Sequence, residues 1–480
     1  NPLLKLGALE LARNIKKGNV SPLEVVDAHI ERIEHVNPKI NAVVANRFER
    51  AREEAIEAGE TLARGEEVGP LHGVPCTIKE TYRLSGMPNT AGSVHRKGQV
   101  SMEDATAVAR VRSAGAIPLG VTNIPEMAMW LESYNNVYGR TSNPYDTTRH
   151  PGGSSGGEAA IIGAGGSPFG LGSDIGGSIR MPAFFCGVYG HKSTGGLVPM
   201  TGHFPRGKGK VERYSVGGPI CRRAKDLMPL LRIIAGPDGK DADTYAMELG
   251  DPSAIKWKDR RVFVLPNLGA RLSVGPNLDQ EVALKRAALA FENKGAIVDE
   301  WTSERFRDAV LIWGSMLSEG STGPSFGEML GQGKEPNYAL ELALCAAGMS
   351  RYTFPALVFG AAEKFMKRTD DDKFIAAGRA LKRELHELLG DDAILLAPTH
   401  PRAAPKHNAP LLRPFDFIYT GIFNVLEVPA TACPMGLGSE RLPVGVQAIG
   451  PVGGDHLTIA AALLLEKENG GWAPPLGSLD

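Results

Sequence analysis

Apolar residues recur along much of the chain at the three- and four-residue spacing of helices. A capping box begins at Ser21, with Pro22 at the first helical position, and apolar side chains then follow at Leu23, Val26 and Ile30. This pattern predicts a helix that starts at Pro22. Further helices are predicted over residues 47–63, 104–114, 225–235, 278–294, 371–389 and 456–466.

Short apolar runs bounded by glycine and proline alternate with these helices, which is typical of an α/β sheet. No Ser/Gly-rich or Pro-rich linker divides the chain, so we expect one continuous domain over residues 1–480. Residues 311–366 look helical, with breaks at Gly323 and near Pro355, and residues 203–210 form the most loop-like interior stretch. Strands are predicted over residues 73–79, 116–121, 262–265, 393–397 and 444–449.

Composition adds a hint about the site and narrows the ligand class. Glycine accounts for 58 of 480 residues without a collagen-like period, which is about 12% against an average of roughly 7%. The excess belongs in turns and where backbone approaches another group closely. The formal net charge of −1 gives no field for nucleic acid or an anionic bilayer, so a small or apolar ligand is expected.

The cysteines and the longest apolar runs indicate the kind of cellular compartment to expect. The five cysteines lie far apart with no CxxC pair, which predicts reduced and mostly buried thiols in a cytoplasmic-type protein. No apolar run approaches the roughly 20 residues of a membrane span. The chain starts at Asn1 rather than Met, so an anchor or signal preceding it stays open. The cysteines are Cys76, Cys186, Cys221, Cys345 and Cys433.

Glycine and serine gather between residues 152 and 196, and several interpretations of this segment compete. A dinucleotide fingerprint is not completed, and a Walker A loop fails because His191 stands where glycine is needed. The lipase elbow GxSxG is matched around both Ser154 and Ser155, but the preceding segment is polar and ends in Pro151, unlike the apolar strand that an elbow follows. A loop that only packs two helices closely also stays open.

Ser178 is a further nucleophile candidate in this segment. It follows Gly176 and Gly177, whose small size leaves backbone N–H groups free to face a developing oxyanion, and it precedes an apolar helix-like run.

A nucleophilic serine also needs a base. The histidines His72, His191 and His400 carry no local signature, whereas Lys79 ends an apolar strand. Burial there would lower the lysine pKa by roughly 3 units and make a neutral amine available as base. A snorkelling or ion-paired lysine is the alternative.

Three segments together resemble the amidase signature family of Ser-Ser-Lys hydrolases. They are Lys79 after HGVPCTI, the stretch PGGSSGGEAA, and the stretch DIGGSIRMPAFFCGVYGHKST. The sequence is most similar to the fatty-acid amide hydrolase 2-type branch and to soluble amidase and urethanase relatives. The resemblance implies an α/β fold, a single domain with a large mixed twisted β-sheet surrounded by helices. Its parts would be N-terminal helices at about 1–65, a signature core at about 70–235, a helical cap at about 305–390, and C-terminal strands and a helix at about 391–480.

The resemblance also implies roles for individual residues. Ser178 would be the nucleophile, Lys79 the base, and Ser154, after an unusual cis peptide bond, the relay between them. No metal or organic cofactor is implied. The oxyanion hole would use the backbone N–H groups of Ile175, Gly176, Gly177 and Ser178, with Ser155, Asp174 and Arg180 as supports. The substrate channel would be lined by Met127, Ala128, Met129, Trp130, Leu131 and Thr420, with Phe415, Phe417, Tyr419 and Ile422 as weaker candidates.

The function expected from this family is hydrolysis of C–N bonds in apolar or aryl amides, with esters and carbamates as further substrates, through an acyl- or carbamoyl-serine. Alternatives are urethanase or aryl acylamidase specificity, a transamidase subunit that needs a partner, and a non-catalytic binding protein. We expect no nucleic-acid partner and a monomer or homodimer. We also expect the loop at residues 203–210 to overhang and gate the site.

Overall fold

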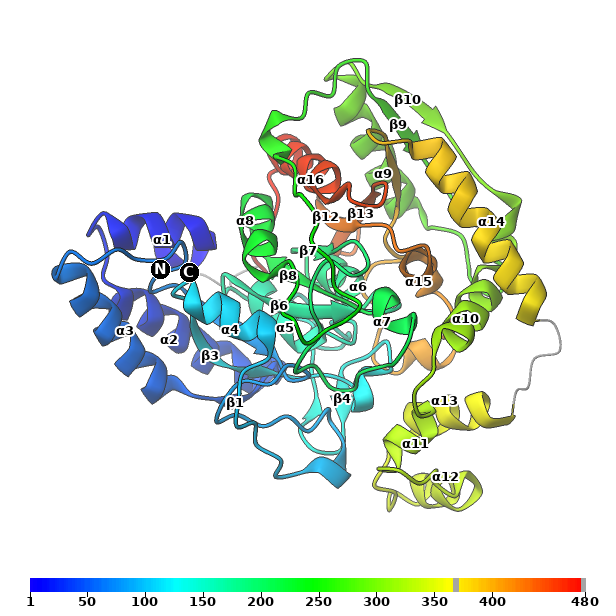
Figure 1. Ribbon diagram of the computed structural model, residues 1–480, viewed down its shortest axis with the longest axis horizontal. Helices are drawn as coiled ribbons and strands as arrows, with labels where there is room; N and C mark the ends of the chain where they lie inside the picture. Colours follow the sequence, from blue (N-terminus) through cyan, green and yellow to red (C-terminus); the bar gives the residue numbers. More distant parts are fainter. Residues whose placement is uncertain (366–370, 476–480) are drawn as a thin grey trace.

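A mixed β-sheet lies at the centre of the computed structural model, which describes residues 1–365 and 371–475. Over these residues, eleven strands pair in the order β1-β3-β2-β6-β8-β7-β12-β13-β11-β9-β10 (Figure 1). The five predicted strands are confirmed as β2, β3, β9, β11 and β13, and the expected α/β class is confirmed. The strands are β1 Val43–Asn46, β2 Pro75–Lys79, β3 Ile117–Thr122, β6 Phe169–Asp174, β7 Tyr189–Lys192, β8 Val216–Cys221, β9 Arg261–Val264, β10 Ile297–Glu300, β11 Ile394–Pro398, β12 Ala430–Leu437 and β13 Pro443–Ile449, with a small separate hairpin of β4 Tyr134–Asn135 and β5 Gly139–Arg140.

The sheet is covered on both faces, and successive side chains along a strand point into the cores on opposite faces. In β11, Ile394 and Leu396 belong to the core on one face, while Leu395 and Ala397 belong to the core on the other. The first core includes residues of α1 Ala8–Lys16, α4 Thr106–Ser113, α8 Ala224–Ile234, α9 Leu278–Glu292 and α16 Asp455–Asn469. The opposite face packs against α2 Pro22–Ile40, α3 Phe48–Ala63, α5 Gly156–Gly163 and α6 Arg180–Phe185, and further along against α10 Ala309–Gly320, α14 Asp371–Leu389 and α15 Ile418–Val425.

The predicted capping box at the start of α2 is confirmed. Glu24 N donates to Ser21 Oγ at 3.1 Å, and Ser21 N donates to the Glu24 carboxylate at 2.8 Å. The helix ends at Ile40, and Asn41 caps it with a left-handed φ of 46°. The shorter helical turns are η1 Pro2–Lys5, η2 Val94–Arg96, η3 Glu126–Ala128, η4 Pro252–Ala254, η5 Glu304–Asp308, η6 Ala409–Leu411 and α7 Val211–Tyr214.

The region predicted as a helix with two breaks is more divided than expected. The breaks at Gly323 and before Pro355 are present, but residues 331–337 form a further break, in which Gly333 has a φ of 97°. Residue 366 lies outside the described residues. The helices here are α10, then α11 Phe326–Leu330, α12 Tyr338–Ala346 and α13 Phe354–Phe365. Figure 1 shows α11, α12 and α13 grouped at the periphery, beyond α10.

The cysteines agree with the expectation of unpaired and mostly buried thiols. All five cysteines are free, and four of them are buried. In the described parts of the chain, no helix combines the length and the apolar character that crossing a membrane requires.

Candidate active site

Lys79 ends β2 with its side chain fully buried. Its Nζ lies within hydrogen-bonding distance of two serine hydroxyls, 2.7 Å from Ser154 Oγ and 2.9 Å from Ser173 Oγ. Burial lowers the pKa of Lys79 to about 7, against the opposing influence of the Asp174 and Glu158 carboxyl groups. A substantial share of this lysine is therefore a neutral amine near neutral pH.

Ser154 lies just before α5, after a backbone turn that brings its hydroxyl to the lysine. The Gly153–Ser154 peptide bond is cis. The next residue, Ser155, donates its N–H to the carbonyl of Ser178 at 3.1 Å, so the two serine segments lie side by side. Ser154 Oγ and Ser178 Oγ share no hydrogen bond among those of the described residues.

The segment from Ile175 to Ser178 connects β6 to α6. Ile175, Gly176 and Ser178 are partly exposed, whereas the residues on either side of the segment are buried. Gly177 has a φ of 119°, and a Cβ at this position would overlap Thr420 Oγ1, so glycine is required. The structure thus exposes the predicted nucleophile beside a run of backbone amides.

The backbone N–H groups of this segment differ in whether they donate a hydrogen bond. Gly177 N donates to Asp174 Oδ1 at 2.7 Å. Those of Ile175, Gly176 and Ser178 donate no hydrogen bond within the part of the chain that the structure describes. Three of the four amides predicted for the oxyanion hole are thus available, and the fourth holds the segment to Asp174.

Asp174 and Arg180 form a fully buried ion pair beneath the segment. Arg180 Nη2 lies 3.0 Å from Asp174 Oδ1, and Arg180 Nε donates to Asp174 Oδ2 at 3.1 Å. Burial by itself would raise the pKa of Asp174, but the Arg180 charge lowers it below its ordinary value. The guanidinium also donates to Gln447 Oε1 at 2.9 Å and to Asn424 Oδ1 at 2.7 Å, two residues that the sequence interpretation missed.

An aromatic pair borders the segment, and the sequence interpretation included only one of its two rings. Trp313 on α10 donates its indole N–H to the carbonyl of Ile175 at 3.1 Å. Its ring meets Phe417 edge-on at a centroid distance of 4.9 Å. Thr420 is buried, with Oγ1 2.9 Å from the carbonyl of Gly176. The rings of Trp313 and Phe417 are both partly exposed, and both lie next to Gly176 of this segment.

The predicted channel residues 127–131 begin in the short turn η3, where Met127 has a left-handed φ of 54°, and continue as irregular backbone. Met127 is buried in the cluster that α11 and α13 contribute to, and Met129 packs against the same cluster. Leu131 packs against Met181, and it lines a cavity of about 150 Å³ together with His150 and His400. Ala128 and Trp130 are half-buried. The backbone of this segment approaches the cis peptide closely, since a Cβ at Gly153 would meet Trp130 O at 2.5 Å.

The weaker channel candidates differ in their exposure to solvent. Phe415 is exposed and Phe417 is partly exposed. Ile422 is buried in the core, and Tyr419 turns its hydroxyl to Asn267 Oδ1 at 2.8 Å. Tyr419 and Ile422 thus serve packing.

The three histidines considered as base bind elsewhere. His191 contacts Asp455 Oδ1 at 3.0 Å, His72 lies 2.9 Å from the carbonyl of Ala58, and His400 lies 2.8 Å from the carbonyl of Arg402.

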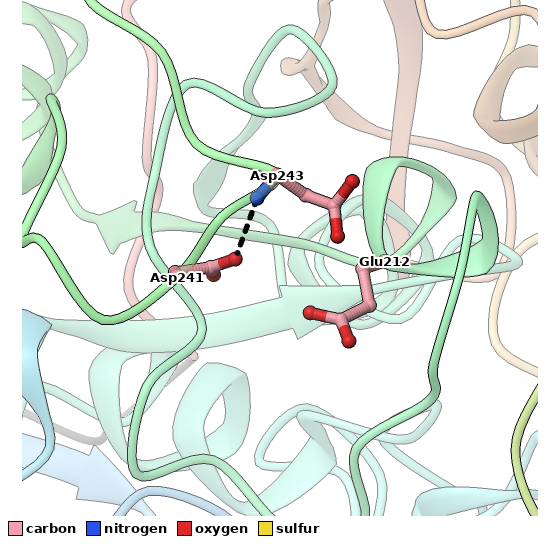
Figure 2. Close-up of side chains that lie close together, drawn as sticks. All are labelled: Glu212, Asp241 and Asp243. Atoms are coloured by element: carbon pink, nitrogen blue, oxygen red, sulfur yellow. Dashed lines mark hydrogen bonds between the residues drawn. The ribbon is translucent and has the colours of Figure 1, made fainter.

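One group in the described part of the chain has a spacing that could suit a metal ion, namely Glu212, Asp241 and Asp243 (Figure 2). Figure 2 shows Asp243 N donating to Asp241, at 3.2 Å. The Arg206 guanidinium pairs with Glu212 and lies 2.9 Å from Asp241 Oδ1. Arg206 thus already supplies the positive charge that a cation would bring, and the cluster anchors the loop that carries Arg206.

Treatment with EDTA is expected to leave amide hydrolysis unchanged, because lysine and serine side chains suffice for the predicted chemistry. The check is the rate before and after chelation and dialysis. A loss of activity that added zinc restores would mean that a metal takes part.

Comparisons with known proteins bear on the family and the fold of this chain. The model of the family described as Amidase matches residues 24–459. The chain is 44% identical to fatty-acid amide hydrolase 2-B of Danio rerio, over 99% of this chain and 91% of that protein. It is 32% identical to an acylamidase of Rhodococcus erythropolis, over 96% and 95% of the two chains. The solved structure of a 6-aminohexanoate cyclic dimer hydrolase with its substrate superimposes with a TM-score of 0.83 at 25% identity, covering 99% of this chain and all of the other.

Proposed function

Because this chain belongs to the amidase signature family and is a hydrolase acting on amides, we propose that it cleaves C–N bonds of apolar or aryl amides through a Ser178, Ser154 and Lys79 triad. The observation that carries the proposal is the 2.7 Å hydrogen bond between the fully buried Lys79 and Ser154. The next residue, Ser155, donates its backbone N–H to the carbonyl of Ser178, which keeps the two serine segments together.

The reaction begins with attack by Ser178 Oγ on the amide carbonyl carbon. The Ser178 proton passes to Ser154 Oγ as the Ser154 proton moves to Lys79 Nζ, and the carbonyl electrons move to the oxygen. As the C–N bond breaks, the proton returns from Lys79 through Ser154 to the leaving nitrogen. Water then attacks the acyl-serine by the same route and releases the acid and Ser178.

The negative oxygen is stabilised by backbone amides of Ile175, Gly176 and Ser178, with Gly177 completing the segment through its bond to Asp174. Removal of one donor from such a hole costs about 10² to 10³ in kcat in serine hydrolases. Ser155, Asp174 and Arg180 hold the segment in place.

Two observations support apolar or aryl substrates. Trp313 and Phe417 lie partly exposed beside Ile175 and Gly176, so an apolar group next to the scissile bond would contact aromatic rings. The similar proteins named fatty-acid amide hydrolase 2 and acylamidase point in the same direction. Esters and carbamates would form a comparable serine intermediate.

A panel of fatty amides, acyl anilides and aryl carbamates tests the proposal. We expect turnover of at least one amide class by the wild type, and none by Ser178→Ala. Turnover that persists in Ser178→Ala, or hydrolysis of glutamine alone and only with partner proteins added, would contradict it.

The pH dependence of kcat/KM is expected to rise through about 7 and then level off. Lys79 acts as base only when it is neutral, and burial lowers its pKa to about 7, so protonation removes the base as the pH falls. Near pH 6 the rate should be about a tenth of the plateau. A pH-rate profile with a good substrate checks this, and a profile that rises only above about 9 would mean that Lys79 keeps an ordinary pKa or is not the base.

A further inference from the structure

The loop that carries His203 is fastened to the backbone that follows Lys79. Arg83 N donates to the carbonyl of Gly202 at 3.0 Å, and Phe204 N donates to the carbonyl of Thr81 at 2.8 Å. These bonds hold the His203 side chain, which is buried, against the end of β2.

The acidic cluster fastens the same loop on its other side. Arg206 pairs with Glu212 and with Asp241, two of the three carboxylates drawn in Figure 2. Asp241 in turn accepts a hydrogen bond from Met200 N at 2.8 Å. His203 therefore sits in a segment that is anchored before and after it.

Hydrogen bonding fixes which ring nitrogen of His203 carries the proton. Nδ1 lies 2.9 Å from the carbonyl oxygen of Pro205, which can only accept, so Nδ1 is the donor. Burial and the nearby Lys79 charge lower the pKa of His203 to about 3, so the ring is neutral and Nε2 is an acceptor. Ser173 Oγ, 2.9 Å from Nε2, must donate its proton to it.

This direction leaves Ser173 Oγ as an acceptor on its other side. There it meets Lys79 Nζ at 2.9 Å, so Lys79 donates to Ser173. The lone pair of the neutral amine is then left to receive the proton of Ser154, 2.7 Å away. Each hydrogen bond of the chain thus has one direction: Ser154 donates to Lys79, Lys79 donates to Ser173, and Ser173 donates to His203.

We propose that His203 is a positioning residue, which acts through Ser173 to direct the lone pair of Lys79 toward Ser154. This inference rests on the proposed function, since it takes Lys79 as the base. Without the His203 acceptor, the Ser173 hydroxyl can turn and donate to the lysine lone pair, where it competes with Ser154.

The loss of His203 is expected to change the pKa of Lys79 in one direction. A hydroxyl that donates to the neutral amine stabilises that form and lowers the pKa of Lys79. The other titratable groups that act on Lys79 are Asp174 on β6 and Glu158 on α5, and both are retained. Simple loosening of the site would instead admit water and raise the lysine pKa toward its ordinary value.

The test measures the rate at which a fluorophosphonate inactivates the enzyme, because this reads activation of the nucleophile without a known natural substrate. The His203→Leu variant should be inactivated about 10- to 100-fold more slowly than the wild type, and the acidic limb of its pH profile should move to lower pH. His203→Gln, whose amide oxygen can replace Nε2 as acceptor, should recover most of the rate. An unchanged rate, or a limb that stays in place or moves to higher pH, would overturn the inference.

Two further variants separate a positioning role from a structural one. In a Ser173→Ala background, His203→Leu should cost less than about twofold, because the two residues act in one chain; additive losses would contradict this. His29 is a matched control, since it is also buried with a pKa lowered to about 3 but binds Val25 and Arg222. His29→Leu should keep the wild-type rate. If Lys79→Met also keeps it, the proposed function fails rather than this inference alone.

Discussion

Replacing Lys79 with methionine is expected to lower kcat/KM by about 10⁴-fold, the upper range for loss of a general base. Methionine keeps the apolar stem of the lysine but removes the amine that accepts the Ser154 proton. The same amine returns a proton to the leaving nitrogen, so both halves of the reaction lose their proton carrier. Steady-state kinetics with the best amide of the panel measures the effect.

Lys192 supplies the matched control for this variant. It is also fully buried, and burial together with the Arg180 charge lowers its pKa to about 7. Its Nζ donates to the carbonyls of Val428 at 2.6 Å and Ser193 at 3.1 Å rather than to a serine hydroxyl of the site. Lys192→Met should keep kcat/KM within about threefold. Equal losses in the two variants would mean that removal of a buried amine, and not of the base, explains the result.

Replacing Asp174 with alanine is expected to destabilise the protein by about 3 to 5 kcal/mol and to abolish detectable turnover. The change leaves Arg180 charged, buried and without its carboxylate, and it leaves Gly177 N and Ile179 N without their acceptor. The proposed oxyanion segment therefore loses its anchor together with the fold's buried ion pair. Urea denaturation gives the change in free energy of unfolding.

An exposed ion pair provides the comparison. Asp299 lies 3.3 Å from Arg261, with side-chain exposures of 49% and 60%. Because solvent screens this pair, Asp299→Ala should change the free energy of unfolding by less than about 1 kcal/mol. A loss for Asp174→Ala no larger than for Asp299→Ala would show that the buried pair does not stabilise the fold.

The sequence predicts elements well where a local pattern specifies them. The capping box at Ser21 and the apolar runs of β2, β11 and β13 are examples. The strand β6 escapes prediction because Gly170 and Gly172 take alternate positions, which removes the apolar alternation. A Cβ at Gly170 would overlap the Glu158 carboxylate, so packing against α5 dictates this composition. In β6, tertiary packing rather than the local apolar pattern determines the residue types.

The same distinction applies to the candidate site. Lys79 and Ser178 stand out locally, one as a lysine that ends an apolar strand and the other as a serine after paired glycines. Gln447 and Asn424 bind Arg180 from positions more than 240 residues further along the chain, and Trp313 reaches Ile175 from a separate helix. A single sequence carries no signal for such pairings, because they depend on how distant elements meet.

The identity of the nucleophile is tested most directly by fluorophosphonate labelling followed by mass mapping of the modified peptide. The account predicts one adduct on Ser178, formed faster as the pH rises through about 7 with the neutral fraction of Lys79. An adduct on Ser155, as a lipase elbow would give, or labelling that survives in Ser178→Ala, would contradict it.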